Sequence, residues 1–288
     1  DGAVGAAGTA TSVAGIPFYR GDGNNSSIYT HDVSGTDDTA QYNTAYGINA
    51  LDAITTGDKN TAIGSAAGSA INTATDSVLI GNEAGAAITT GVKNVAVGSF
   101  ALDALNTGSQ NTALGHQALT ADTKGGRNVA VGHGTLLTQN FTSATSSYNV
   151  AVGYNAGNLI TTGPNNTLIG ALSGDAITTG SENTGVGRDT LGSLTEGGQN
   201  TAVGYGAGAS LTSAGGNIAI GYQALDAADT ENNNLAIGEA ALGVVNGGGE
   251  YNIAIGKSSL AALTSGDDNI AIGYNAGSAN TSGGQNIY

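Results

Sequence analysis

The chain has 288 residues, of which 49 are Gly and 2 are Pro, and Cys, Met and Trp are absent. Without Cys there are no disulfides, zinc-thiolate sites or Cys nucleophiles. The 22 acidic and 7 basic residues give a net charge of −15, so neither nucleic acid nor an anionic membrane is an expected partner, and no apolar run is long enough to cross a membrane.

Residues 1–42 come first and keep no period. They begin with small apolar residues and continue through a polar stretch, GDGNNSSIYTHDVSGTDDTAQ. Because an open end of a stacked β structure exposes strand edges, we expect this segment to cap or join the domain that follows. A first residue of Asp in a chain without Met also indicates that the chain is processed or is part of something longer.

Residues 43–288 repeat one phrase, N-x-A-x-G, in fourteen full units. The Gly that ends the phrase recurs thirteen times after Gly47, at intervals of 17 residues in eleven cases, 21 in one and 18 in one. This period is too short for a helical-hairpin repeat, and the Gly content is unfavourable for long helices. The pattern predicts an all-β fold, a parallel β-solenoid of about fourteen 17-residue coils with two short strands in each coil.

The phrase alternates with a period of two, as a β-strand does. If the first position is numbered zero, positions 1 and 3 are β-branched or aliphatic, and positions 0, 2 and 4 are mostly Asn, Ala and Gly. We expect the aliphatic columns to line the inside of the solenoid. The Ala column would then lie on an exposed flat face, which predicts packing against other copies of the chain.

Position zero is almost always Asn, and Ser77 is an exception. Stacked side-chain amides can bond to one another or to turn backbone, so we predict a structural ladder. Its members are Asn43, Asn60, Asn94, Asn111, Asn128, Asn149, Asn166, Asn183, Asn200, Asn217, Asn234, Asn252 and Asn269.

Position 5 varies most from unit to unit, and variation marks an outward position. Four of its members are Tyr, namely Tyr154, Tyr205, Tyr222 and Tyr274. Exposed aromatic rings can stack on sugars or on receptor side chains, so these residues are candidates for surface recognition, although they could equally cover a turn. The four-residue insertion within residues 139–148 predicts a loop that adds further variable surface.

The sequence contains few candidates for catalytic or cofactor-binding residues. His116 and His133 occupy position 5 of consecutive units and are the candidates for a metal site, although two His in a variable surface column favour a structural role. No acid–base pair, nucleophile motif or phosphate loop stands out, so we expect no enzyme and no cofactor.

Several stretches of the repeat are similar to a known type of repeat; examples are NTAIGSAA (60–67), NVAVGSFA (94–101) and NIAIGKSS (252–259). They resemble the head repeats of trimeric autotransporter adhesins of the YadA type, with a 17-residue period in place of about fourteen. The longer phrase is also similar to repeats of phage tail fibres and bacterial surface fibres. The resemblance covers residues 43–288 and implies a β-roll that trimerises, outside a cell or on a virion.

The resemblance therefore implies a structural and adhesive fibre segment whose partners are two further copies of itself and a host receptor or glycan. Two alternatives remain. The phrase that opens at Asn286 is cut after three residues, which predicts either a slice of a longer fibre or a head-to-tail filament. Paired Thr at 55–56, 89–90, 161–162 and 178–179 suggest an ice-binding solenoid, but Asn72, Asn106 and Glu196 interrupt that column.

Overall fold

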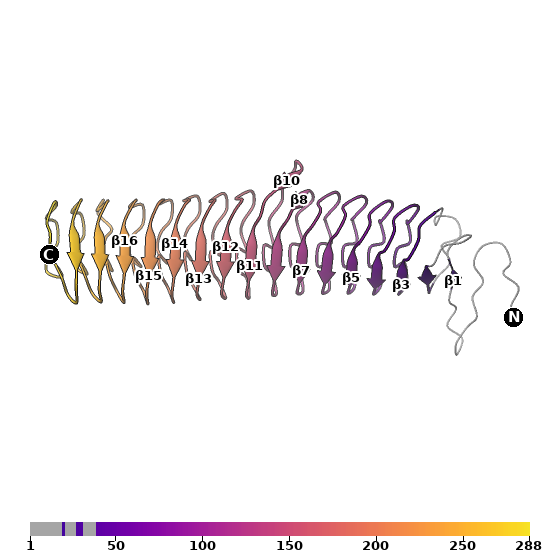
Figure 1. The fold of residues 1–288 in the computed structure, drawn as a ribbon, viewed down its shortest axis with the longest axis horizontal. Helices are drawn as coiled ribbons and strands as arrows, with labels where there is room; N and C mark the ends of the chain where they lie inside the picture. The colour runs from indigo at the N-terminus through magenta and orange to yellow at the C-terminus, as the bar shows by residue number, and fades with distance from the viewer. Residues whose placement is uncertain (1–18, 21–26, 31–38) are drawn as a thin grey trace, which may run out of the picture. The chain divides into compact units, whose positions relative to one another are not determined.

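The computed structural model describes residues 19–20, 27–30 and 39–288, and for Tyr19 and Arg20 only the backbone. Most of the predicted capping segment, residues 1–42, thus lies outside the described residues. The chain divides into two compact units, Asp1–Ser147 and Tyr148–Tyr288, and the division falls directly after the insertion. Each unit is a stack of coils (Figure 1).

The described part of unit 1 contains ten strands, and most of its coils contribute one three-residue strand. Strand β2 pairs antiparallel with β1, and parallel pairing then runs from β2 through β7 to β9. The strands are β1 (Tyr19–Arg20), β2 (Ile28–Tyr29), β3 (Thr44–Tyr46), β4 (Thr61–Ile63), β5 (Val78–Ile80), β6 (Val95–Val97), β7 (Thr112–Leu114), β8 (Gly125–Gly126), β9 (Val129–Val131) and β10 (Thr145–Ser146).

Unit 2 contains eight strands in one parallel sheet, and neighbours in sequence are neighbours in the sheet. They are β11 (Val150–Val152), β12 (Thr167–Ile169), β13 (Thr184–Val186), β14 (Thr201–Val203), β15 (Ile218–Ile220), β16 (Leu235–Ile237), β17 (Ile253–Ile255) and β18 (Ile270–Ile272). Register advances by a full repeat at each step, so Ala202 lies beside Ala219.

The all-β parallel solenoid with a 17-residue repeat is confirmed, and none of the described residues is helical. The described residues accordingly contain no helix that is long and apolar enough to cross a membrane. The expectation of two strands per coil is wrong, because most coils hold one strand and complete the turn with bends. These bends also hydrogen-bond from coil to coil, as in Leu51 N–H to Ala67 O at 3.1 Å and Ala53 N–H to Ser69 O at 3.1 Å.

The predicted direction of the strand side chains is reversed. The Ala column at position 2 is buried, whereas the β-branched and aliphatic side chains at positions 1 and 3 point outward and are partly exposed. The coil is narrow, so small side chains fit between its walls at the strand. Larger apolar groups enter the core from positions 8 and 11, as Leu102 and Leu105 do, both fully buried.

The Gly at position 4 closes each strand. Gly98 has φ of +137°, and a Cβ added there would lie 2.5 Å from the carbonyl oxygen of Gly115 in the next coil. Its N–H donates to Ile80 O of the preceding coil at 2.8 Å. Close approach of successive backbones therefore requires Gly at this position in coil after coil.

The first Thr of each Thr-Thr pair is tied into the stack. Thr55 Oγ1 donates to Asn72 Oδ1 at 2.6 Å, and Thr161 Oγ1 donates to Thr178 O at 3.0 Å. These hydroxyls bond to the neighbouring coil, which reduces their capacity to order external water.

Candidate ligand-binding site

The Asn column forms a continuous network within each unit. Asn200 illustrates it: its Oδ1 accepts from the backbone N–H of Asn217 at 3.0 Å, and its Nδ2 donates to Ala214 O of its own turn at 2.8 Å. The side chain is 1% exposed. An Asn bonded in this way joins its strand to the turn of its own coil and to the next strand, and the Asn residues of the predicted ladder are buried, which leaves them no surface for a ligand.

The four Tyr of position 5 all lie at the surface, with exposed fractions of 42% for Tyr205 and 74% for Tyr274. Tyr205 and Tyr222 stack with ring centroids 5.5 Å apart and planes 13° apart. The guanidinium of Arg188 lies over Tyr205 at 5.1 Å and also bonds to Asp189. Tyr154 and Tyr274 are several coils from this pair, so the four do not form one cluster.

His116 and His133 stack with centroids 5.2 Å apart, and Phe100 meets His116 edge-on at 6.1 Å. In the described part of the chain, no three His, Cys, Asp or Glu side chains gather in a way that could hold a metal ion. The arrangement is a short ladder of flat rings, and two imidazoles alone make a poor ligand set.

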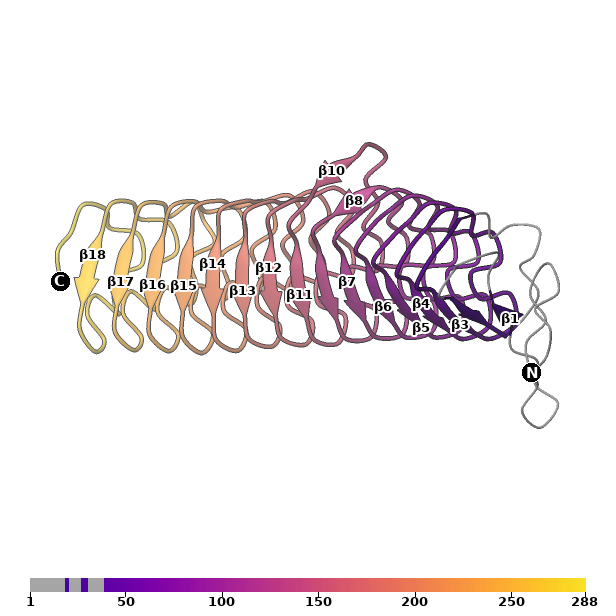
Figure 2. The same cartoon turned by 45° about the vertical axis from the view of Figure 1, so that its right-hand side comes forward.

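The insertion adds a second pair of strands to unit 1. Residues of β10 pair in parallel with β8, with Thr145 beside Gly125 and Ser146 beside Gly126. Strand β8 lies at the edge of the coils, away from the main sheet of unit 1, and the loop that leads into β10 projects beyond that edge (Figures 1 and 2). We call this pair of strands and the loop between residues 139 and 145 the shelf.

Two buried polar residues hold the shelf in place. Asp122 and Gln139 occupy position 11 in consecutive coils, where most coils carry an aliphatic residue. Gln139 Nε2 donates to Asp122 Oδ2 at 2.7 Å, and the N–H groups of Gly125 and Phe141 donate to Asp122 Oδ1 at 2.8 and 3.2 Å. One buried carboxylate therefore fixes both the turn that leads into β8 and the loop that leads to β10.

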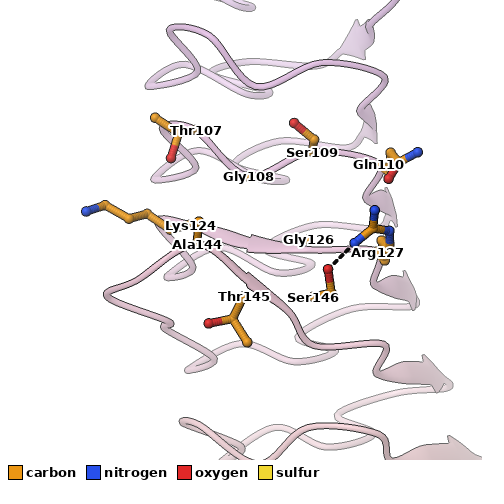
Figure 3. Close-up of a pocket in the computed structure, with 10 residues that line it drawn as sticks. All are labelled: Thr107, Gly108, Ser109, Gln110, Lys124, Gly126, Arg127, Ala144, Thr145 and Ser146. Atoms are coloured by element: carbon orange, nitrogen blue, oxygen red, sulfur yellow. Dashed lines mark hydrogen bonds between the residues drawn. The ribbon is translucent and has the colours of Figure 1, made fainter.

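A hollow of about 200 Å³ lies between the shelf and the preceding turn, and we call it the shelf pocket. Figure 3 shows Lys124 at one end and Arg127 at the other, with Ser and Thr side chains between them. The guanidinium of Arg127 donates to the hydroxyl of Ser146. The lining residues are Thr107, Gly108, Ser109, Gln110, Lys124, Gly126, Arg127, Ala144, Thr145 and Ser146.

Sequence reasoning located the insertion but missed the pocket beside it. The available signal was the loss of the aliphatic residue at position 11 in the coil that contains the insertion and in the coil before it. A polar residue at a core position requires a partner, and here both replacements are partners of each other and of the loop. Lys124 and Arg127 then stand on the turn that this network holds.

Comparison of the chain with protein-family models, with curated proteins and with solved structures finds no match. Three features of the described surface could bind a ligand or a partner. Unit 1 carries a basic hydroxyl-lined pocket, unit 2 carries a stacked Tyr pair beside Arg188, and both carry outward aliphatic columns along their main strands.

Proposed function

We propose that the chain is a segment of an extracellular fibre that assembles as a homotrimer and projects binding surface for attachment to a host or other surface. The observation that carries the proposal is the outward face of the main strands. We call this the strand face of each unit, and it consists of positions 1 and 3 of β3–β7 and β9 in unit 1 and of β11–β18 in unit 2. Its members are Thr, Val, Ile, Leu and one Tyr, and none is charged.

The strand face is most apolar in unit 2. Strands β15–β18 have aliphatic residues at both outward positions, and Ile218 and Ile272 are 39% and 61% exposed. An aliphatic surface of this kind on a chain with 22 acidic residues is typical of a protein interface, where charged side chains are depleted.

A copy of the same chain is the best-matched partner for the strand face. The face repeats with the rise of one coil, so a second face with the same repeat can match it over many coils. The internal core also consists largely of Ala, Leu and Ile and is thin, and association would add apolar burial that one coil lacks. The resemblance to trimeric adhesin heads supports three as the number of chains.

Light scattering on the purified full chain tests the assembly. A single chain has a mass of 27.9 kDa, so a trimer has three times that, 83.7 kDa. We expect the trimer mass. A mass of 27.9 kDa would overturn the proposal, and a very large, polydisperse mass would favour the head-to-tail filament.

A paired substitution tests whether the strand face is the contact. Val203→Lys with Ile220→Lys places two charges on neighbouring strands of unit 2, and we expect a monomer with an unchanged circular dichroism spectrum. Gln199→Lys adds a charge at an exposed position off this face and should leave the trimer intact. A Val203→Lys, Ile220→Lys variant that remains trimeric would assign the contact to another surface.

A further inference from the structure

We propose that the shelf pocket binds a carboxylate-bearing monosaccharide, such as a hexuronate or sialate residue of a larger glycan. The inference rests on the proposed attachment function and names the chemical class of the ligand. It has its own observations, because the pocket belongs to unit 1 and lies away from the strand face that would mediate assembly.

Charge is the first of these observations. The whole chain has 7 Lys and Arg against 22 Asp and Glu, yet two of the seven line this pocket, and none of its lining residues is acidic. Arg127 lies beside Ser146, whereas the ammonium group of Lys124 is directed away from the other lining side chains (Figure 3). A local positive surface on an acidic protein attracts anions selectively to that place.

The lining residues then indicate which class of anion suits the pocket. Arg127 presents a planar fork that suits a carboxylate, and the Ser146 hydroxyl that it already contacts lies at the same end of the pocket. The Ser, Thr and Gln side chains can donate to or accept from sugar hydroxyls. No aromatic or large aliphatic residue lines the pocket, so an apolar ligand would gain little there.

Size favours a single sugar residue. The pocket of about 200 Å³ is smaller than the ~300–1,000 Å³ typical of sites for drug-sized ligands, and a water molecule takes ~30 Å³. It has room for one ring with its substituents. The lining residues come from two successive turns and from the shelf, so a longer glycan would continue outside the pocket.

The pocket is also rigidly built. Asp122 fixes both of its walls through the bonds already described, and its oxygens accept from those donors instead of lining the pocket. A Cβ on Gly125 would overlap the Asp122 carboxylate, so Gly is required where the turn enters β8. Gly126 passes close to the turn before it, because a Cβ there would lie 2.9 Å from Ser109 O. Walls held in this way lose little freedom when a ligand binds.

Titration of the full chain tests the proposal, with saturation-transfer NMR and calorimetry as readouts. The probes are glucuronate, N-acetylneuraminate, glucose and inorganic phosphate. We expect millimolar binding of the two acidic sugars and none of glucose. Arg127→Gln should weaken binding by about tenfold or more, because it removes the charged fork, and Lys124→Gln should weaken it less.

The chain offers a matched control for these variants. Lys93→Gln removes the same charge from an exposed position two coils away, and Lys93 stands at the same place in its coil as Arg127. Gln110 occupies this place in the preceding coil with φ of +63°, so Gln at position 127 can adopt the backbone conformation that Arg127 has there, with φ of +64°. Lys93→Gln should bind acidic sugars as the unchanged chain does.

Two outcomes would overturn the inference. One is equal response to glucuronate and glucose, or binding that Arg127→Gln and Lys124→Gln leave unchanged. The other is phosphate binding as strong as that of the acidic sugars, which would make the pocket a general anion site. Light scattering on the same samples separates this failure from that of the proposed function, because trimer formation does not involve the pocket.

Discussion

The Asn ladder shows how one type of side chain can hold the strand and the turn of a coil together. The amide suits the position because it has one acceptor for the next strand and a donor group for its own turn, and a carboxylate would lack the donor. Ser77 keeps the ladder continuous but makes one bond fewer: its N–H donates to Asn60 Oδ1 and its hydroxyl accepts from Asn94 N–H, yet the side chain is too short to cross to the turn as Asn does.

Ser77→Asn should therefore stabilise unit 1. The added amide can donate across the coil as its equivalents Asn60 and Asn94 do, and a buried hydrogen bond of this kind contributes about 1 kcal/mol to the free energy of unfolding. Urea titration followed by circular dichroism measures the change. The reverse substitution in unit 2, Asn200→Ser, should lower the unfolding midpoint, and a lower midpoint for Ser77→Asn would contradict the ladder as the reason for Asn.

Positions 2 and 8 share one volume in the core. Leu79 replaces the usual Ala at position 2, and Gly85 stands at position 8 of the same coil, where a Cβ would lie 2.8 Å from Leu79 Cδ2. The next coil has the opposite combination, with the small Ala96 at position 2 and the large Leu102 at position 8. Both residues at position 8 have a left-handed backbone, with φ of +61° for Gly85 and +53° for Leu102. The space available in the core, and not the backbone conformation, therefore determines whether position 8 holds Gly or Leu.

A double-mutant cycle tests this exchange. Gly85→Leu overfills the coil and should cost about 1–3 kcal/mol, and Leu79→Ala leaves a cavity and should cost about 2–5 kcal/mol. The double variant restores the arrangement of the next coil, so its loss of stability should be clearly smaller than the sum. Additive losses in urea unfolding would mean that the two positions do not share their volume.

At the scale of the element, position 9 places an Asp at the edge of several coils. Burial raises the pKa of Asp103, Asp175 and Asp226 above the ordinary 3.8, and the nearby Asp189 raises that of Asp175 further. The folded state therefore holds these protons more tightly than the unfolded chain. Stability gained from them is present at low pH and is lost as pH rises from 3.8 through the raised pKa values.

Each unit should accordingly become more stable as mild acid protonates these side chains. Asp103→Asn, Asp175→Asn and Asp226→Asn should each raise the unfolding temperature at neutral pH and reduce its change toward acid. Glu196→Gln removes the same charge from an exposed side chain and serves as the control. Thermal unfolding followed by circular dichroism at several pH values gives both quantities, and equal effects of all four variants would point to net charge instead of burial.

The strand also shows where sequence reasoning succeeds and fails. The period and the parallel stacking could be predicted, because the phrase recurs with Gly at one fixed place. The direction of the side chains could not, because both faces of the phrase are apolar. The direction depends on the space that position 8 leaves in the core: Ala96 lies inside beside Leu102, Leu79 lies inside beside Gly85, and Val95 and Val97 point outward.

The candidate site was predicted less completely for a related reason. A repeat pattern describes what the coils share, and the shelf pocket arises where they differ. The position of the insertion was visible, but its pairing with Gly125 and Gly126 depends on a turn in the preceding coil. Asp122 joins the two through space, over 17 and 19 residues to Gln139 and Phe141, and no local motif encodes that contact.

At the scale of the whole molecule, the proposed assembly sets two forces against each other. The strand face is uncharged and aliphatic, so its burial favours association. Each chain also carries a net charge of −15, so three chains brought together repel one another. Salt screens that repulsion, since the Debye length falls from ~10 Å at 0.1 M to ~3 Å at 1 M, and leaves apolar burial largely unchanged.

The proposed trimer should therefore tighten as salt is added. Sedimentation equilibrium at low, intermediate and high NaCl concentrations measures the dissociation constant, which we expect to fall with each step. Val203→Lys with Ile220→Lys should stay dissociated throughout, because screening does not restore the lost apolar contact. If added salt instead weakened the trimer, ion pairs between chains would have to hold it together, and the strand face, which has no charged residue, would not be the contact.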